Sequence, residues 1–179
     1  MGMTVKQQKV IDSFRGRYAF LSNFYPVSIK FEGMTYSSVE HAFQAAKSHD
    51  PAYRAQVAAA VTPAGAKRLG HGTRLRQDWM QVRLQVMEDL VLQKFAEYLD
   101  LMDALLKTND AVLIEGSIYG DVFWGATRDA NGELVGQNNL GKILMKIREE
   151  ITKAYYDTEE ADDEEAAYSP GHPDNFGDR

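Results

Sequence analysis

The sequence predicts a mostly helical α+β domain with a small β-sheet. Apolar residues recur at helical spacing over most of the chain, whereas only short segments alternate apolar and polar residues as half-buried strands do. A chain of 179 residues with 44% hydrophobic residues has room for one domain with a sizeable core. Helices packed with a small sheet account for this pattern.

The helices are expected from their apolar stripes and from their start and stop signals. Thr62-Pro63 is the clearest start, because Thr caps a helix and Pro fits its first turn, and Gly70 ends that helix. The longest helix carries an apolar stripe that includes Trp79 and Phe95. The expected helices cover residues 38–47, 51–61, 63–70, 77–99, 101–107 and 140–153.

Extended structure is expected in a few short segments. VSIKFEGMTY alternates apolar and polar residues on both sides of Glu32-Gly33, which predicts a hairpin. Residues 111–117 (AVLIEGS) are a strand candidate, and Asn131-Gly132 is a strong hairpin turn signal. Residues 10–24 are predicted to be irregular or extended.

The charge is divided unevenly along the chain, so the net charge of -6 hides two different parts. Residues 157–179 hold nine acidic residues and one basic residue, and they lack apolar periodicity. We therefore expect a domain over residues 10–156 and a disordered acidic tail over residues 157–179. Residues 1–156 keep a formal charge of roughly +2, which suits a small phosphorylated ligand but is also ordinary for a solvated surface.

Several classes of protein are excluded by composition. The chain has no cysteine, which excludes disulfides, thiol catalysis and thiolate metal sites. No segment has the roughly 20 apolar residues that cross a bilayer, and the first residues lack the apolar stretch of a secretory signal. The histidines share no recognised ligand spacing, so we predict no metal and no cofactor. We expect a cytoplasmic protein.

Glu40 has two interpretations. Ser37-x-x-Glu40 matches a capping box, in which the Glu side chain accepts a hydrogen bond from the backbone N–H of the cap residue. Alternatively, Glu40 and Gln44 lie one helical turn apart and project together, so that the carboxylate polarises water while Gln44 positions a ligand hydroxyl. The two interpretations do not exclude each other.

Three further side chains have a structural and a functional interpretation. Asp121 lies between glycines and close to Trp124, where a carboxylate can be partly desolvated, but it can equally bond the backbone of its own turn. Trp79 is either a core residue or a flat surface on which a base stacks. His41 is expected to be a packed or hydrogen-bonded histidine.

Basic residues near these motifs can bind a phosphate group. Arg is favoured because its planar guanidinium donates two parallel hydrogen bonds, although each such residue alone is more often a surface charge. The candidates are Arg15, Arg17, Lys47, Lys67, Arg68, Arg74 and Arg76.

A series of motifs in order resembles the YbiA-like, or NADAR, family. The resemblance covers residues 14–151, nearly all of the predicted domain, and it is specific because so many motifs occur in order. The motifs are SNF (22–24), SxEHxFQxxK (38–47), KRLG (67–70), RxDW (76–79), VM (86–87), KF (94–95), DxxWG (121–125) and NxLGxxLMxIR (138–148).

The resemblance implies an N-glycosidase that hydrolyses early intermediates of riboflavin biosynthesis and releases ribose 5-phosphate from a pyrimidine. It also implies the site residues, with Glu40 and Asp121 as the catalytic carboxylates and Trp79 lining the base or sugar pocket. Asn23 and Gln44 are expected to contact ribose. The expected substrate-binding set is completed by Trp124, Arg15 and Lys67.

One departure from the expected family pattern leaves the substrate open. The resemblance leads us to expect a short glycine-rich loop after Gly125, where this chain has ATRDANGELVGQNN. One alternative is a hydrolase that removes ADP-ribose from modified guanine in nucleic acid, and only then is nucleic acid a partner. Another is a non-catalytic module that binds ADP-ribose or a nucleotide. A third is an interaction protein acting through its acidic tail.

Overall fold

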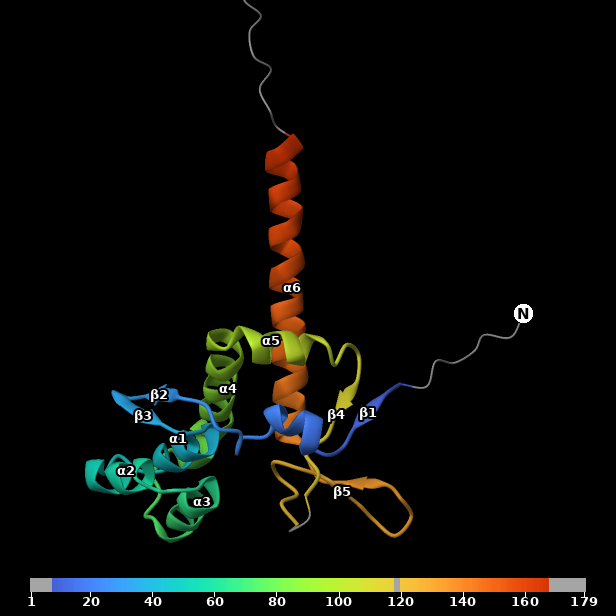
Figure 1. Ribbon diagram of the computed structural model, residues 1–179. Coiled ribbons are helices and arrows are strands. Elements are labelled where there is room, and N and C mark those ends of the chain that lie inside the picture. The colour runs from blue at the N-terminus through green and yellow to red at the C-terminus, as the bar shows by residue number, and fades with distance from the viewer. Residues whose placement is uncertain (1–7, 118–119, 168–179) are drawn as a thin grey trace, which may run out of the picture.

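The computed structural model describes residues 8–117 and 120–167 of the chain. It is an α+β fold in which helices dominate, as the sequence predicts (Figure 1). The elements are β1 (Val10–Ile11), the 3-10 helix η1 (Gly16–Leu21), β2 (Ile29–Phe31), β3 (Met34–Tyr36), α1 (Val39–Ala45), α2 (Pro51–Ala58), α3 (Pro63–Gly72), α4 (Trp79–Glu97), α5 (Leu99–Leu106), β4 (Val112–Leu113), β5 (Thr127–Arg128), β6 (Leu134–Val135) and α6 (Asn139–Ala167).

Helix α1 lies at the centre of the domain. It packs against α2, α3 and α4 and against the strands β2 and β3. Val39, Ala42 and Phe43 are buried, as their helical spacing predicts. The polar residues Glu40 and Gln44 are buried as well, so α1 has no solvent-exposed side. A short helix enclosed in this way brings polar side chains into the middle of the protein.

The remaining core forms between the longer helices. Helix α4 packs against α5 and α6, and α6 packs against β4. Figure 1 shows α6 standing beside α4, with α5 crossing near the upper end of α4. The predicted apolar stripes supply the contact, since Leu90 and Phe95 of α4 and Leu144 and Ile147 of α6 are buried. Among residues 8–117 and 120–167, no helix combines the length and apolar character that crossing a membrane requires.

The strands form three separate pairs. β2 and β3 are antiparallel, and the turn between them places both Glu32 and Gly33 at positive φ, as a two-residue hairpin turn requires. β5 and β6 form a second hairpin around Gly132, so both predicted hairpins are confirmed. β1 and β4 pair in parallel, with Val10 opposite Val112.

The structure differs from the sequence prediction mainly at element ends. Residues 16–21, expected to be irregular or extended, form the 3-10 helix η1. The strand predicted over residues 111–117 is confined to β4, because the chain leaves β1 after Leu113 and pairs briefly with Ala126 through Gly116. Tyr98 adopts an extended conformation and separates α4 from α5, so the two helices are confirmed, with the break between them at residue 98 and not at residue 100.

The acidic tail begins in helical backbone. Helix α6 was expected to end near Lys153 and the tail to be disordered from Asp157, but the helix continues to Ala167. Alanine and glutamate are abundant there, and their high intrinsic helix propensity extends a helix that the core has already nucleated. The part of the predicted tail from residue 168 onward lies outside the described residues.

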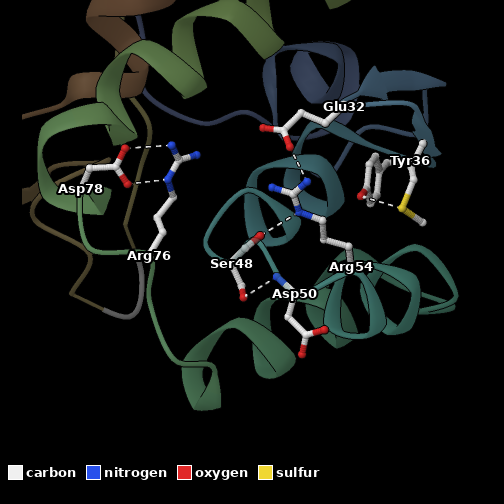
Figure 2. A network of polar contacts seen from close by, with 8 residues as sticks. Glu32, Tyr36, Ser48, Asp50, Arg54, Arg76 and Asp78 are labelled. Carbon is white, nitrogen blue, oxygen red and sulfur yellow. Dashed lines mark hydrogen bonds and ion pairs between the residues drawn. The ribbon is translucent and has the colours of Figure 1, made fainter.

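A buried arginine fixes the turn between α1 and α2 (Figure 2). The Arg54 Nε donates to the carbonyl oxygen of Ser48 at 2.7 Å, and its Nη1 pairs with the Glu32 carboxylate in the β2–β3 turn. Asp50 caps α2 by accepting a hydrogen bond from the backbone N–H of Ala52 at 2.9 Å. The hairpin and α2 are therefore held to the same end of α1.

Lys94 in α4 is a buried amine bound to the segment that follows η1. Its side chain is 1% exposed, and Nζ donates to the carbonyl oxygen of Ser22 at 2.8 Å. The rings of Tyr25 and Phe95 lie 5.3 and 5.2 Å from Nζ. Burial lowers the pKa of Lys94 from 10.5 to about 7. The amine thus anchors the chain immediately before Asn23 at a cost in desolvation.

Lys94→Met should raise the free energy of unfolding by about 1–3 kcal/mol at about pH 6. The folded protein holds this proton less tightly than the unfolded chain, so the cost is complete below about pH 7 and shrinks as the pH rises toward 10.5. Urea unfolding of both proteins at about pH 6 and about pH 9 measures the effect, and the gain should be smaller at the higher pH. A loss of stability at the lower pH would mean that the hydrogen bond to Ser22 outweighs the desolvation.

Candidate active site

A cavity of about 1080 Å³ opens between α1, α3, α4, the segment around η1 and the loops that follow β4. All eight side chains that the sequence analysis assigned to the site line this cavity. They come from segments as far apart as Arg15 and Trp124. The fold therefore brings together the residues that the motifs singled out.

The start of α1 presents Glu40 to the cavity and does not use it as a cap. Ser38 is the cap residue, and its Oγ accepts a hydrogen bond from the backbone N–H of His41 at 3.2 Å. The capping box predicted from Ser37 and Glu40 is therefore wrong, because the cap residue is Ser38 and Glu40 takes no part in the cap. The backbone N–H of Glu40 donates to the carbonyl oxygen of Asn23 at 3.0 Å. Its carboxylate remains available for another role.

The surroundings of Glu40 make its carboxylate unusually basic. The residue is 5% exposed, and burial raises the pKa of its carboxyl. The hydrogen bond from Gln44 Nε2 at 2.7 Å and the ammonium groups of Lys67 and Lys47 oppose this effect. The negative charge of Asp121 adds to the rise.

Asp121 bonds the backbone of its own turn and also lines the cavity. Its Oδ1 accepts hydrogen bonds from the backbone N–H groups of Phe123 at 3.2 Å and Trp124 at 3.0 Å, so it does fix its own turn. The residue is part of the wall of the cavity that Glu40 also lines. Its backbone N–H donates to Ser117 Oγ at 2.6 Å, which attaches the turn to the segment after β4.

Aromatic rings form one wall of the cavity. The ring centroid of Phe43 lies 5.0 Å from that of Trp79 and 5.3 Å from that of Trp124. Trp79 is 5% exposed and belongs to the hydrophobic core, so the core interpretation is confirmed, yet it also lines the cavity. Trp124 is only half-buried. These flat surfaces suit a planar ligand.

An ion pair between Arg76 and Asp78 lies immediately before Trp79, at the start of α4 (Figure 2). Arg76 Nε and Nη2 donate to the two carboxylate oxygens of Asp78 at 2.6 and 2.8 Å. The backbone N–H of Arg76 donates to the carbonyl oxygen of Lys47 at 2.7 Å, which joins this segment to the end of α1. The RxDW motif therefore fixes the backbone that leads into Trp79.

Only some of the candidate phosphate-binding residues reach the cavity. Arg15, Lys47 and Lys67 line it, whereas Arg17, Arg68, Arg74 and Arg76 are not part of its wall. Burial lowers the pKa of Lys47, while the nearby Glu40 carboxylate raises it and Lys67 lowers it. The cavity thus holds carboxylates and ammonium groups together, an arrangement suited to a ligand that carries both hydroxyl and phosphate groups.

Asn23 and Gln44 are buried amides on the cavity wall. Asn23 Nδ2 lies 3.2 Å from Met87 Sδ, a weak hydrogen bond. Gln44 is 3% exposed, and its Oε1 has no hydrogen-bond partner among the described residues. A Cβ at Gly70 would lie 1.7 Å from this oxygen, so the glycine in α3 makes room for the amide.

The sequence analysis missed several residues of the wall. Glu115 follows β4 and lines the cavity, although it was considered only as part of a strand. The one indication of this position in the sequence is that a charged residue ends an apolar run. Arg83 and His71 also line the cavity, and the Arg83 guanidinium lies 3.6 Å from the ring centroid of Phe123. No spacing rule identifies these two, because their neighbours come from distant segments.

The fold and the cavity define a small α+β domain whose cavity is lined by carboxylates, basic residues and aromatic rings. The NADAR domain family matches residues 11–152, and the chain belongs to this family.

Relatives of known name share most of the chain. N-glycosidase Npun_R5314 of Nostoc punctiforme is 42% identical over 139 residues, which cover 75% of this chain and 86% of that protein. N-glycosidase YbiA of Escherichia coli is 36% identical over 136 residues, covering 75% and 82% of the two chains. The riboflavin biosynthesis protein VVA0006 of Vibrio vulnificus is 40% identical, but the match spans 36% of its length. The NMR structure of E. coli YbiA aligns with a TM-score of 0.66 at 30% identity, covering 94% of this chain and 96% of the other.

Gly70→Ala should displace Gln44 from Glu40, because the new Cβ would overlap Gln44 Oε1. Loss of that hydrogen bond should raise the pKa of Glu40 further and lower the free energy of unfolding by about 1 kcal/mol. Carboxyl NMR titration and urea unfolding measure the two effects. Gly72→Ala in the same helix is the matched control, since its Cβ would meet nothing within 4 Å. Identical titration of Glu40 in both variants would contradict the role given to Gly70.

Proposed function

We propose that this protein is an N-glycosidase that hydrolyses the bond between a ribose phosphate and a nitrogen base, releasing ribose 5-phosphate. The observation that carries the proposal is the meeting of Glu40 and Asp121, from distant parts of the chain, on the wall of one cavity flanked by aromatic rings. The names of the relatives support it, since several are N-glycosidases and others are riboflavin biosynthesis proteins. An intermediate of riboflavin biosynthesis is therefore the first substrate to test.

The two carboxylates suit the charge that develops in this reaction. Cleavage of an N-glycosidic bond places positive charge on the anomeric carbon and the ring oxygen of the sugar. A fixed carboxylate next to that carbon stabilises the cation, and a basic carboxylate removes a proton from the attacking water. Burial raises the pKa of Glu40, which makes its carboxylate a stronger base than an exposed glutamate. Asp121 is held rigidly by two backbone N–H groups. Together they share water activation and cation stabilisation.

The other side chains orient the substrate. Trp79 and Trp124 offer flat surfaces for the planar base. Asn23 and Gln44 are placed to hydrogen-bond ribose hydroxyls, and Arg15 and Lys67 are placed to bind the phosphate. Binding the phosphate away from the reacting bond lowers the entropic cost of aligning the sugar with the carboxylates. A phosphorylated metabolite also fits the cytoplasmic location expected from the sequence.

Glu40→Gln and Asp121→Asn should each lower kcat by at least about 100-fold without unfolding the protein. Each change removes a negative charge and keeps the shape of the side chain. Initial rates of sugar phosphate release measure the effect, with circular dichroism as the test of folding. Glu97→Gln on the exposed side of α4 is the control and should retain the wild-type rate. Near-normal hydrolysis by both site variants would disprove the mechanism.

The substrate is tested by offering the protein two ribosylated bases side by side. We expect release of ribose 5-phosphate from a ribosylaminopyrimidine phosphate, followed by mass spectrometry, and no release of ADP-ribose from ADP-ribosylated guanine DNA. The comparison is needed because Thr127, Arg128 and Leu134 of the β5–β6 hairpin line the cavity, in the segment where the chain departs from the expected family pattern. Activity on the DNA alone would favour the ADP-ribosyl alternative. Tight binding with no sugar released from either would favour a binding module.

A further inference from the structure

We propose that Glu115 is the acid of this site, donating its proton to the nitrogen that leaves the sugar. The inference rests on the proposed glycosidase function and deepens it, because the departing base needs a proton, whereas Glu40 and Asp121 are already engaged as hydrogen-bond acceptors. The argument starts from the hydrogen bonds that each of the three carboxyl groups makes.

Glu40 and Asp121 are both held as hydrogen-bond acceptors. The Glu40 Oε1 accepts from the amide of Gln44, and Asp121 Oδ1 accepts from two backbone N–H groups. In Glu40 this hydrogen bond opposes the rise in pKa that burial causes. Glu115 differs, since its Oε2 is buried and has no hydrogen-bond partner in residues 8–117 and 120–167. A buried carboxyl oxygen without a donor is compatible with a neutral acid, in which the other oxygen carries the proton.

The backbone holds Glu115 rigidly against the cavity. Its N–H donates to Asn138 Oδ1 at 3.0 Å, and its carbonyl oxygen accepts from the N–H of Ala126 at 2.9 Å. A Cβ at Gly125 would lie 2.5 Å from the same carbonyl oxygen, so the DxxWG segment packs directly on this residue. The side chain lines the cavity with Asp121, which belongs to that segment. Glu115 therefore lies on the same rigid wall as one of the proposed catalytic carboxylates.

The charges around Glu115 agree with an acid that is protonated below neutral pH. Burial raises the pKa of its carboxyl to about 7, and Lys67 of α3 opposes this rise. The negative charges of Asp121 and Glu40 add to the rise, and Arg15 near η1 opposes it. An acid with this pKa matches the working range for proton donation near neutral pH.

The proposed step is balanced in atoms and protons. The bond between the anomeric carbon and nitrogen breaks, its electron pair stays on nitrogen, and nitrogen takes the proton from Glu115. The oxygen of water bonds to the anomeric carbon, and its proton passes to Glu40 or Asp121. Exchange with solvent then returns the proton to Glu115 and restores the other carboxylate. The net reaction adds one water across the glycosidic bond.

The test compares two leaving groups in wild type and Glu115→Gln. With a ribosylaminopyrimidine phosphate, the variant should lose at least about 100-fold in kcat, because its amide cannot protonate the departing nitrogen. With 4-nitrophenyl riboside 5-phosphate, whose leaving group needs no proton, the variant should stay within about threefold of wild type. Glu40→Gln should be impaired on both substrates. Unchanged turnover of the pyrimidine substrate, or equal loss on both substrates, would overturn the role of Glu115.

The pH profile supplies a second measurement that does not need the variant to fold. In wild type, kcat/KM for the pyrimidine substrate should fall above about pH 7, where Glu115 loses its proton, and the nitrophenyl substrate should lack this decline. The same decline with both substrates, or with neither, would contradict the inference. Failure of wild-type protein to cleave the pyrimidine substrate would instead count against the glycosidase function itself.

Discussion

The enclosure of α1 on every side is the constraint on which the rest of the structure depends. A helix surrounded by α2, α3, α4 and a hairpin buries its polar side chains with its apolar ones. Burying Glu40 costs free energy unless hydrogen bonds and opposite charges compensate. Gln44 donates to it directly, and Lys47 and Lys67 supply positive charge from the neighbouring elements. The apolar packing elsewhere thus offsets the cost of burying a carboxyl group on the cavity wall.

The elements around α1 share the task of keeping it in place. Arg54 ties the β2–β3 turn to the chain that leaves α1. The backbone N–H of Arg76, which donates to the carbonyl oxygen of Lys47, does the same for the start of α4. Lys94 holds the segment before Asn23, whose carbonyl oxygen accepts the N–H of Glu40. Residues that do not line the cavity are therefore linked to its wall by hydrogen bonds. Several of them, such as Arg76 and Lys94, belong to the motifs that carry the family resemblance.

Much of this organisation was predictable from the sequence, because helical periodicity and hairpin signals are local. The stripes of α4 and α6 and the turn at Glu32-Gly33 follow from neighbouring residues alone. The cap of α1 was misassigned because Ser37 and Ser38 are both suitable caps, and only the packing on Asn23 decides between them. Glu115 could not be assigned to the site, since its burial and its approach to Glu40 arise from contacts between distant segments. The family motifs supplied the long-range information that local patterns lack.

The β5–β6 hairpin contributes Thr127, Arg128 and Leu134 to the cavity, while Glu40 lies on a different and deeply buried element. The hairpin and the buried carboxylate thus belong to separable portions of the polypeptide. An exposed loop tolerates insertion and exchange far better than an enclosed helix does. In such an architecture, changes in the exposed β5–β6 hairpin can alter ligand preference while the enclosed helix and its carboxylate are retained.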